Sequence, residues 1–134
     1  MKNPVLAGAI AGLVSAIVGA LLLFVGAPIG LWGFGTLFPA TLQTYAATTF
    51  IVLAVIFGPI VALIYSRFYD LIPGSGLRKG LNFGLIVWVV KDIQAAAYVT
   101  ISMMQPIMIG VNLIVGGFYM WITYGLVIAY LYKR

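Results

Sequence analysis

Four long apolar stretches occupy most of this 134-residue chain: Val5–Ala27, Tyr45–Ser66, Gly80–Thr100 and Pro106–Tyr132. Hydrophobic residues make up 64% of the chain and charged residues 7%, whereas soluble domains are about 45–50% apolar and about 25% charged. Each stretch can cross the ~30 Å hydrocarbon core as a helix, which satisfies its own backbone hydrogen bonds where lipid cannot. The sequence therefore predicts an all-α fold: one membrane domain, residues 1–134, built as a bundle of four transmembrane helices in a lipid bilayer.

The residue types that the chain lacks narrow its chemistry. It contains no Cys and no His, which excludes thiol catalysis, disulfides, thiolate or imidazole metal sites and the commonest general base. Its only acids are Asp70 and Asp92, which the predicted helices place at different depths. The sequence therefore predicts no catalytic residues, no metal site and no cofactor.

Basic residues gather at one end of the predicted bundle. Six of the seven lie before the first span, between the second and third, or after the fourth: Lys2, Arg67, Arg78, Lys79, Lys133 and Arg134. By the positive-inside rule we expect a cell-membrane protein with both termini in the cytoplasm. This placement explains the net charge of +5 without a nucleic-acid partner. One alternative is a leader cleaved after Val25-Gly26-Ala27, although the apolar run exceeds a typical signal segment.

Two connections between the spans have distinctive compositions. Residues 28–39 are rich in Gly, Pro and aromatic residues, which predicts an interfacial belt or, alternatively, a re-entrant loop. In the other connection, Pro73-Gly74 is typical of a type II turn, and we expect Ser75 to cap the third helix. The aromatic residues of the first connection are Trp32, Phe34 and Phe38.

Small residues at four-residue spacing predict where the helices pack, because helices in lipid associate through close backbone contact. Pro59 and Gly116-Gly117 are candidate hinges, for which packing is the alternative explanation. The predicted packing rows are Gly8, Gly12, Ala16 and Ala20 in the first span, Ala54, Gly58 and Ala62 in the second, and Gly80 with Gly84 in the third.

A weak internal repeat relates the two halves of the chain. The first and third spans each begin with glycines four apart, and the second and fourth spans end alike. A parallel duplication of a helical hairpin is one interpretation; the other is that Gly, Tyr and Arg are common at such positions. The matching residues are Gly58, Tyr65 and Arg67 in the second span and Gly125, Tyr132 and Arg134 in the fourth.

Lys91 and Asp92 lie in the middle of the third span, where packing does not explain them. Lys91 is eleven residues from both Gly80 and Ser102, roughly 16 Å from either end and too deep to snorkel fully. A charge there costs about 2.5–3.5 kcal/mol on insertion scales, so it needs a partner or water. Neighbouring residues on a helix do not face each other, so we expect no ideal ion pair between the two.

A polar site is predicted around these two residues. Lys91 shares a helical stripe with Gly84, Trp88, Gln94 and Tyr98, and three further polar residues lie at similar depth on other spans. The predicted site consists of Lys91, Asp92, Gln94, Tyr98, Ser15, Tyr119 and Thr123.

The stretch from Tyr65 to Gly84, YSRFYDLIPGSGLRKGLNFG, followed by Trp88, resembles a group of small four-span prokaryotic membrane proteins of unassigned function. The resemblance covers about a quarter of the chain and implies no activity. Small multidrug exporters carry an acidic residue in the first span, which is absent here. Both the exporters and the small fluoride channels often show weak charge bias, so the chain is assigned to neither.

These features leave three classes of function. The first is a non-enzymatic membrane component, either an accessory or scaffold subunit or a homo-oligomer, held by the small-residue faces and by Lys91 and Asp92. The second is a small transporter or channel that uses the same two residues. An intramembrane enzyme comes third, because the sequence contains no recognisable nucleophile–base arrangement. The expected partners are lipid, further copies of the chain or other membrane subunits.

Overall fold

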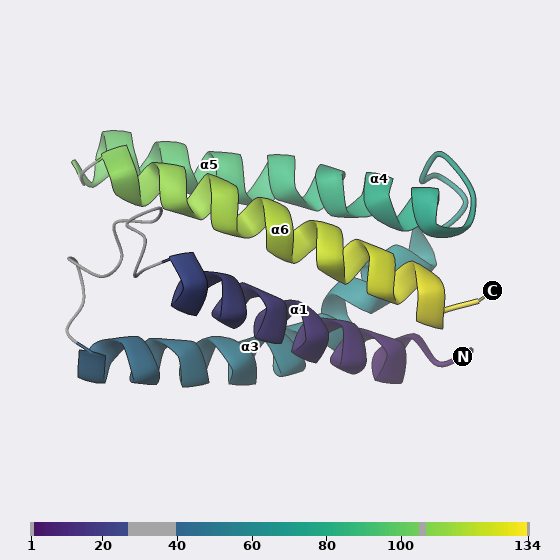
Figure 1. Cartoon of the computed structure of the whole chain (residues 1–134). Helices are drawn as coiled ribbons and strands as arrows, with labels where there is room; N and C mark the ends of the chain where they lie inside the picture. The colour runs from purple at the N-terminus through teal and green to yellow at the C-terminus, as the bar shows by residue number, and fades with distance from the viewer. Residues whose placement is uncertain (1, 27–39, 105–106, 134) are drawn as a thin grey trace.

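The computed structural model describes residues 2–26, 40–104 and 107–133, whose regular structure is entirely helical. The segments from α4 to η2 follow one another without a break and form a single rod, so the described residues build four long helices, as predicted (Figure 1). In chain order the elements are α1 (Pro4–Gly26), α3 (Ala40–Arg67), α4 (Gly76–Trp88), the π-helix η1 (Val89–Ile93), α5 (Gln94–Ala97), the π-helix η2 (Tyr98–Ser102) and α6 (Ile107–Leu131).

Three helices are long and apolar enough to cross a membrane by length and composition, and they cover Pro4–Leu22, Gly76–Ser102 and Ile107–Leu131. Helix α3 adds a shorter apolar segment, Ile51–Arg67. Large apolar side chains are exposed along all of these helices, a surface that a bilayer solvates better than water does. The fold is therefore that expected of a membrane-embedded protein.

The second and third helices extend beyond their predicted boundaries. Helix α3 begins at Ala40, five residues before the predicted start at Tyr45, and the third rod begins at Gly76 and continues to Ser102. The added residues, 40–44, 76–79 and 101–102, flank the apolar stretches from which the boundaries were predicted. The aromatic residues predicted to form a belt or re-entrant loop, at positions 32, 34 and 38, lie outside the described residues.

The connection between α3 and α4 turns at Gly74. Its φ of +98° is the left-handed conformation that the third residue of a type II turn requires, and glycine adopts it without strain. Ser75 occupies the N-cap position of α4 in an extended conformation, but its side chain makes no capping hydrogen bond. The prediction of a Ser75 cap was therefore right in position and wrong in mechanism.

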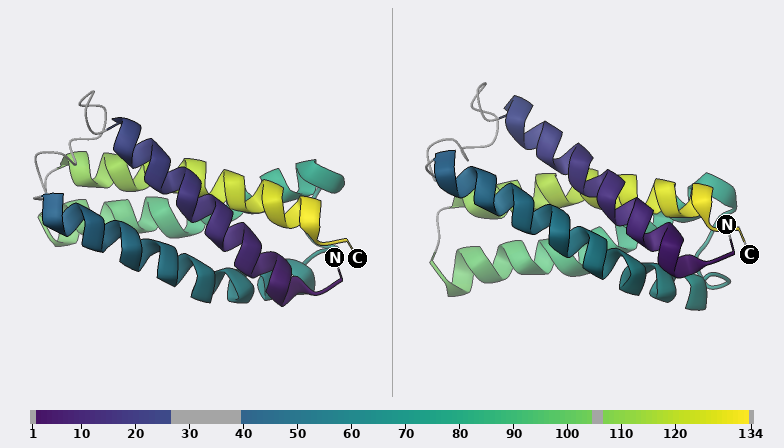
Figure 2. Two further views of the ribbon diagram at one scale, coloured as in Figure 1. Left: turned by 60° about the horizontal axis from the view of Figure 1, so that its bottom comes forward. Right: turned by 90° about the horizontal axis from the view of Figure 1, so that it is seen from below.

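The helices form two hairpins, one made of α1 and α3 and the other of the α4–η2 rod and α6. The hairpins meet through α1 and α6. Helix α3 also reaches the second hairpin, through the ring contact of Tyr65 with Phe83 and the hydrogen bond from Tyr124 to the Gly58 carbonyl, so the four helices form a bundle (Figure 2). The α3–α4 connection and the marked chain ends lie at the same end of the bundle (Figure 1). This is the arrangement that the distribution of basic residues predicts.

Each hairpin closes on glycines at corresponding positions. In the first hairpin a Cβ at Gly8 would overlap the Gly58 carbonyl, and in the second a Cβ at Gly80 would overlap the Gly125 carbonyl. The second glycine of each pair, Gly12 or Gly84, meets a carbonyl one helical turn further along the partner helix. Because the contacts match residue by residue, the internal repeat seen in the sequence is also a repeat of helix packing.

Aromatic rings fill the space between the hairpins at the end of the bundle that carries the α3–α4 connection. Tyr65 is buried, with ring centroids 4.9 Å from Phe83 and 6.2 Å from Tyr132. Lys79 reaches into this cluster, donating a 2.7 Å hydrogen bond to the Tyr69 carbonyl and lying 4.0 Å from the centre of the Tyr69 ring. These contacts hold the two hairpins together at one end.

Candidate functional site

The α4–η2 rod faces α6 with every fourth residue. Trp88 donates a 2.8 Å hydrogen bond from Nε1 to the Ile114 carbonyl, and Asp92 packs directly against Gly117. An α-helix has 3.6 residues per turn, so a row of fourth residues would drift around its surface. The two π-helical segments widen the turn and hold the row in place. The complete row is Gly80, Gly84, Trp88, Asp92, Ala96 and Thr100.

This geometry corrects the predicted stripe beyond Trp88. The Asp92 side chain is 6% exposed and faces α6, whereas the Lys91 side chain is 59% exposed. Gln94 and Tyr98 are also exposed on the surface of the rod. The prediction assumed a uniform α-helical period, which the π-helix η1 breaks at the two charged residues. The stripe of Lys91, Gln94 and Tyr98 therefore lies outside the bundle in a single copy of the chain.

The expectation that Lys91 and Asp92 form no ideal ion pair was also wrong. Lys91 Nζ lies 2.8 Å from Asp92 Oδ1 in a hydrogen-bonded ion pair. The four-carbon Lys side chain is long enough to bend back across the rod, so the diverging directions of adjacent residues do not prevent contact. The ammonium also lies 5.4 Å from the centre of the Trp121 ring, within the range of a cation–π interaction.

Asp92 fits against α6 because Gly117 has no side chain. A Cβ at Gly117 would overlap the carboxylate, whereas a Cβ at Gly116 would meet nothing within 4 Å. Asp92 Oδ2 is buried without a hydrogen-bond partner among the described residues, and so is Trp121 Nε1. Buried polar atoms are nearly always paired in native structures, so unpaired atoms of this kind indicate a functional site or a missing partner.

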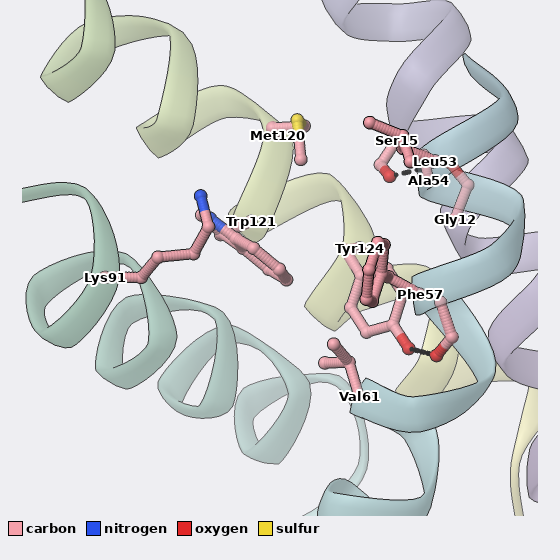
Figure 3. A pocket seen from close by; sticks show the side chains of 11 residues that line it. Gly12, Ser15, Leu53, Ala54, Phe57, Val61, Lys91, Met120, Trp121 and Tyr124 are labelled. Carbon is pink, nitrogen blue, oxygen red and sulfur yellow. Dashed lines mark hydrogen bonds between the residues drawn. The ribbon is translucent and has the colours of Figure 1, made fainter. Parts of the chain in front are cut away.

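A cavity of about 250 Å³ lies beside the ion pair, between the two hairpins (Figure 3). Lys91 and Trp121 line one side, and Ser15 and Tyr124 approach it from α1 and α6. Ser15 Oγ donates to the Gly12 carbonyl at 2.9 Å. Tyr124 Oη donates to the Gly58 carbonyl at 2.5 Å. The remaining lining residues are Gly12, Leu53, Ala54, Phe57, Gly58, Val61 and Met120.

The structure assembles only part of the predicted polar site. It places Ser15 on the same cavity as Lys91, whereas Tyr119 and Thr123 do not line that cavity and Tyr119 is exposed. Sequence reasoning missed Gly117, Trp121 and Tyr124 as members of the site. The available signal was Gly116-Gly117 in the middle of an apolar stretch, which marks a place where another helix or side chain approaches closely.

The internal repeat shows that this site belongs to one hairpin only. Gly8 and Gly80 are 72 residues apart, and the residues 72 positions before Lys91 and Asp92 are Gly19 and Ala20. The first hairpin therefore has the same packing scaffold without the charged pair. Comparisons of the chain with models of protein families, with curated proteins and with solved structures find no match.

Proposed function

We propose that this chain is a non-enzymatic, multi-pass component of the cell membrane, with both termini in the cytoplasm, that assembles with further copies of itself or with other membrane subunits. The observation that carries this proposal is the exposed polar stripe of Lys91, Gln94 and Tyr98. Lys91 lies near the middle of the 27-residue segment Gly76–Ser102, at a depth where an exposed polar side chain is costly unless protein or water covers it. A partner helix at this stripe would remove that cost.

The small-residue rows and the polar stripe lie on different helix faces, and we assign them different roles. Their glycines are used within each hairpin, at Gly8, Gly12, Gly58, Gly80 and Gly84, and Ala16 is fully buried. These residues therefore build the single chain, and the polar stripe is left to bind partners. The resemblance to small four-span prokaryotic membrane proteins agrees with this proposal and remains a prediction.

Single-cysteine crosslinking tests the assembly, because the natural chain has no Cys. Gln94→Cys in native membranes should form a disulfide-linked dimer on mild oxidation, or a covalent adduct with a stoichiometric membrane partner. The control is Leu13→Cys on α1, which is 40% exposed and lies away from the stripe; it should crosslink far less. A chain that purifies as a monomer from mild detergent and shows equal, weak crosslinking at both positions would refute the proposal.

A small transporter or channel is the second candidate function. The observation that favours it is the buried, unpaired Asp92 Oδ2 beside the Lys91 ion pair and the cavity, since intramembrane charges often mark ion or proton paths. If the pair is a structural lock, removing one partner should destabilise the fold by about 3–5 kcal/mol, and Lys91→Met with Asp92→Asn should restore much of that loss. Ion or proton flux in reconstituted wild type, lost in a well-folded double variant, would favour the transporter instead.

A further inference from the structure

The cavity between the hairpins has one side with unused hydrogen-bond donors. Ser15 and Tyr124 have already donated their hydroxyl protons to backbone carbonyls. Trp121 Nε1 has no partner among the described residues, and Lys91 Nζ directs one of its three protons to Asp92. Figure 3 shows the nitrogen edge of the Trp121 indole turned toward the Lys91 ammonium. The Lys91 ammonium lies 5.4 Å from the centre of the Trp121 ring and both residues line the cavity, so the two donors belong to the same side of it.

The charge balance of the site selects the kind of acceptor. Lys91 and Asp92 are a neutral pair, so an added carboxylate or phosphate would bring an excess negative charge into an apolar environment, where an isolated charge is costly. A neutral oxygen, such as a carbonyl, can accept from both donors without that cost. Apart from Ser15 and Tyr124, whose hydroxyl groups already donate to backbone carbonyls, the rest of the cavity wall is apolar and includes Leu53, Phe57 and Met120.

Access to the cavity is from the side of the bundle. Leu53 and Phe57 line it and are themselves 45% and 54% exposed, so the cavity opens along α3. The Lys91 side chain is 59% exposed, so it can shift enough to admit an oxygen atom beside Trp121 Nε1 while Nζ keeps its contact with Asp92. In the membrane placement proposed above, such a lateral opening faces the acyl chains, so a ligand must be soluble in the bilayer.

We propose that this cavity binds an uncharged, bilayer-soluble molecule that carries a carbonyl oxygen, with the oxygen accepting hydrogen bonds from Trp121 Nε1 and Lys91 Nζ and the hydrocarbon portion lying along Leu53 and Phe57. The inference rests on the proposed membrane placement, and it adds a ligand class to the site. It does not depend on the chain forming an oligomer.

The test compares three probes of matched chain length on the full chain reconstituted in lipid nanodiscs: the ketone 2-undecanone, the hydrocarbon undecane and undecanoate. Calorimetric titration should give at least ~tenfold tighter binding of the ketone than of the hydrocarbon, because two hydrogen bonds are gained. Equal binding of ketone and hydrocarbon would mean a plain apolar groove, and tighter binding of undecanoate would mean an anion site. Either result overturns the proposal.

Two tryptophan variants locate the contact. Trp121→Phe keeps an aromatic ring and removes the N–H, so it should abolish the preference for the ketone over undecane. Trp88→Phe is the matched control, because the Trp88 indole donates to the Ile114 carbonyl and does not line the cavity; it should keep the preference. An unchanged preference in well-folded Trp121→Phe would overturn the assignment.

A cavity-filling variant keeps the proposal testable if Trp121→Phe does not fold. Leu53→Trp adds bulk at an exposed position on the rim and should weaken binding of both ketone and undecane by at least ~tenfold. Undiminished ketone binding in this variant would place the ligand elsewhere and overturn the proposal. Crosslinking at Gln94 is measured separately, so failure of the assembly proposal and failure of the ligand proposal give different results.

Discussion

Gly117→Ala isolates the contact that sets Asp92 against α6. The added Cβ would overlap Oδ2 and Cγ of Asp92 and press on its Cβ, so the buried carboxylate must rotate away and strain its ion pair with Lys91. The neighbouring substitution Gly116→Ala is a matched control, because its Cβ meets nothing within 4 Å. The two variants thus share chemistry and helix and differ only in the space that the new methyl group enters.

The expected magnitude follows from two opposing effects. Replacing an interior helical glycine by alanine stabilises a helix by roughly 0.5–1 kcal/mol, and both variants gain this amount. Overpacking of a well-filled contact costs about 1–3 kcal/mol, which only Gly117→Ala incurs. The free energy of unfolding of Gly117→Ala should therefore lie about 1–3 kcal/mol below that of Gly116→Ala, and Gly116→Ala should be as stable as wild type or slightly more stable.

The measurement is reversible unfolding in mixed detergent micelles, followed by circular dichroism, for both variants and for wild type. A double-mutant cycle with Asp92→Ala attributes the cost to the carboxylate: in that background the penalty of Gly117→Ala should shrink by at least about 1 kcal/mol. Equal stability of Gly117→Ala and Gly116→Ala would refute the packing of Asp92 against α6, and with it the four-residue row on the rod.

Three further results are expected. A single cysteine at Ser75 should react with an impermeant thiol reagent only after cells are opened. A single cysteine at Met104, at the opposite end of the rod, should react in intact cells. The reverse labelling pattern would contradict the proposed orientation. Gly12→Leu should lower the melting temperature in detergent much more than Leu13→Ala does. A side chain at Gly12 would meet the α3 backbone, whereas Leu13 is exposed. Equal melting temperatures would show that α1 and α3 pack less closely than described. Tyr124→Phe should cost about 1 kcal/mol of unfolding free energy through loss of its hydrogen bond to an α3 carbonyl, and no loss in chemical denaturation would contradict that bond.

The four-helix architecture and the hairpin crossings were predictable from the sequence. Apolar stretches of helical length, separated by short polar or Gly-Pro connections, leave few alternatives for a chain with so few charges. The glycine rows were equally informative, because only residues without a side chain let two helix backbones approach within contact, as Gly8 and Gly58 do. The repeat of Gly80 and Gly125 follows the same logic in the second hairpin.

The candidate site, by contrast, was decided by tertiary structure. Sequence periodicity at 3.6 residues placed Lys91 on the stripe of Gly84 and Trp88 and predicted no ideal ion pair with Asp92, whereas the structure buries Asp92, exposes Lys91 and pairs the two. The cause is the π-helical turn at Val89–Ile93, which changes the rotation of the rod after Trp88.

No local sequence pattern in the third span predicts the π-helical turn at Val89–Ile93. It is favoured by what lies across from it on α6, where Gly117 leaves room for the Asp92 carboxylate and Trp121 lies beside the Lys91 ammonium. Residues of the fourth helix thus determine which side of the third helix faces the protein. The presence of a helix and its rows of small contact residues can be predicted from a single segment of the chain. The rotation of that helix about its own axis is fixed only when a neighbouring helix packs against it.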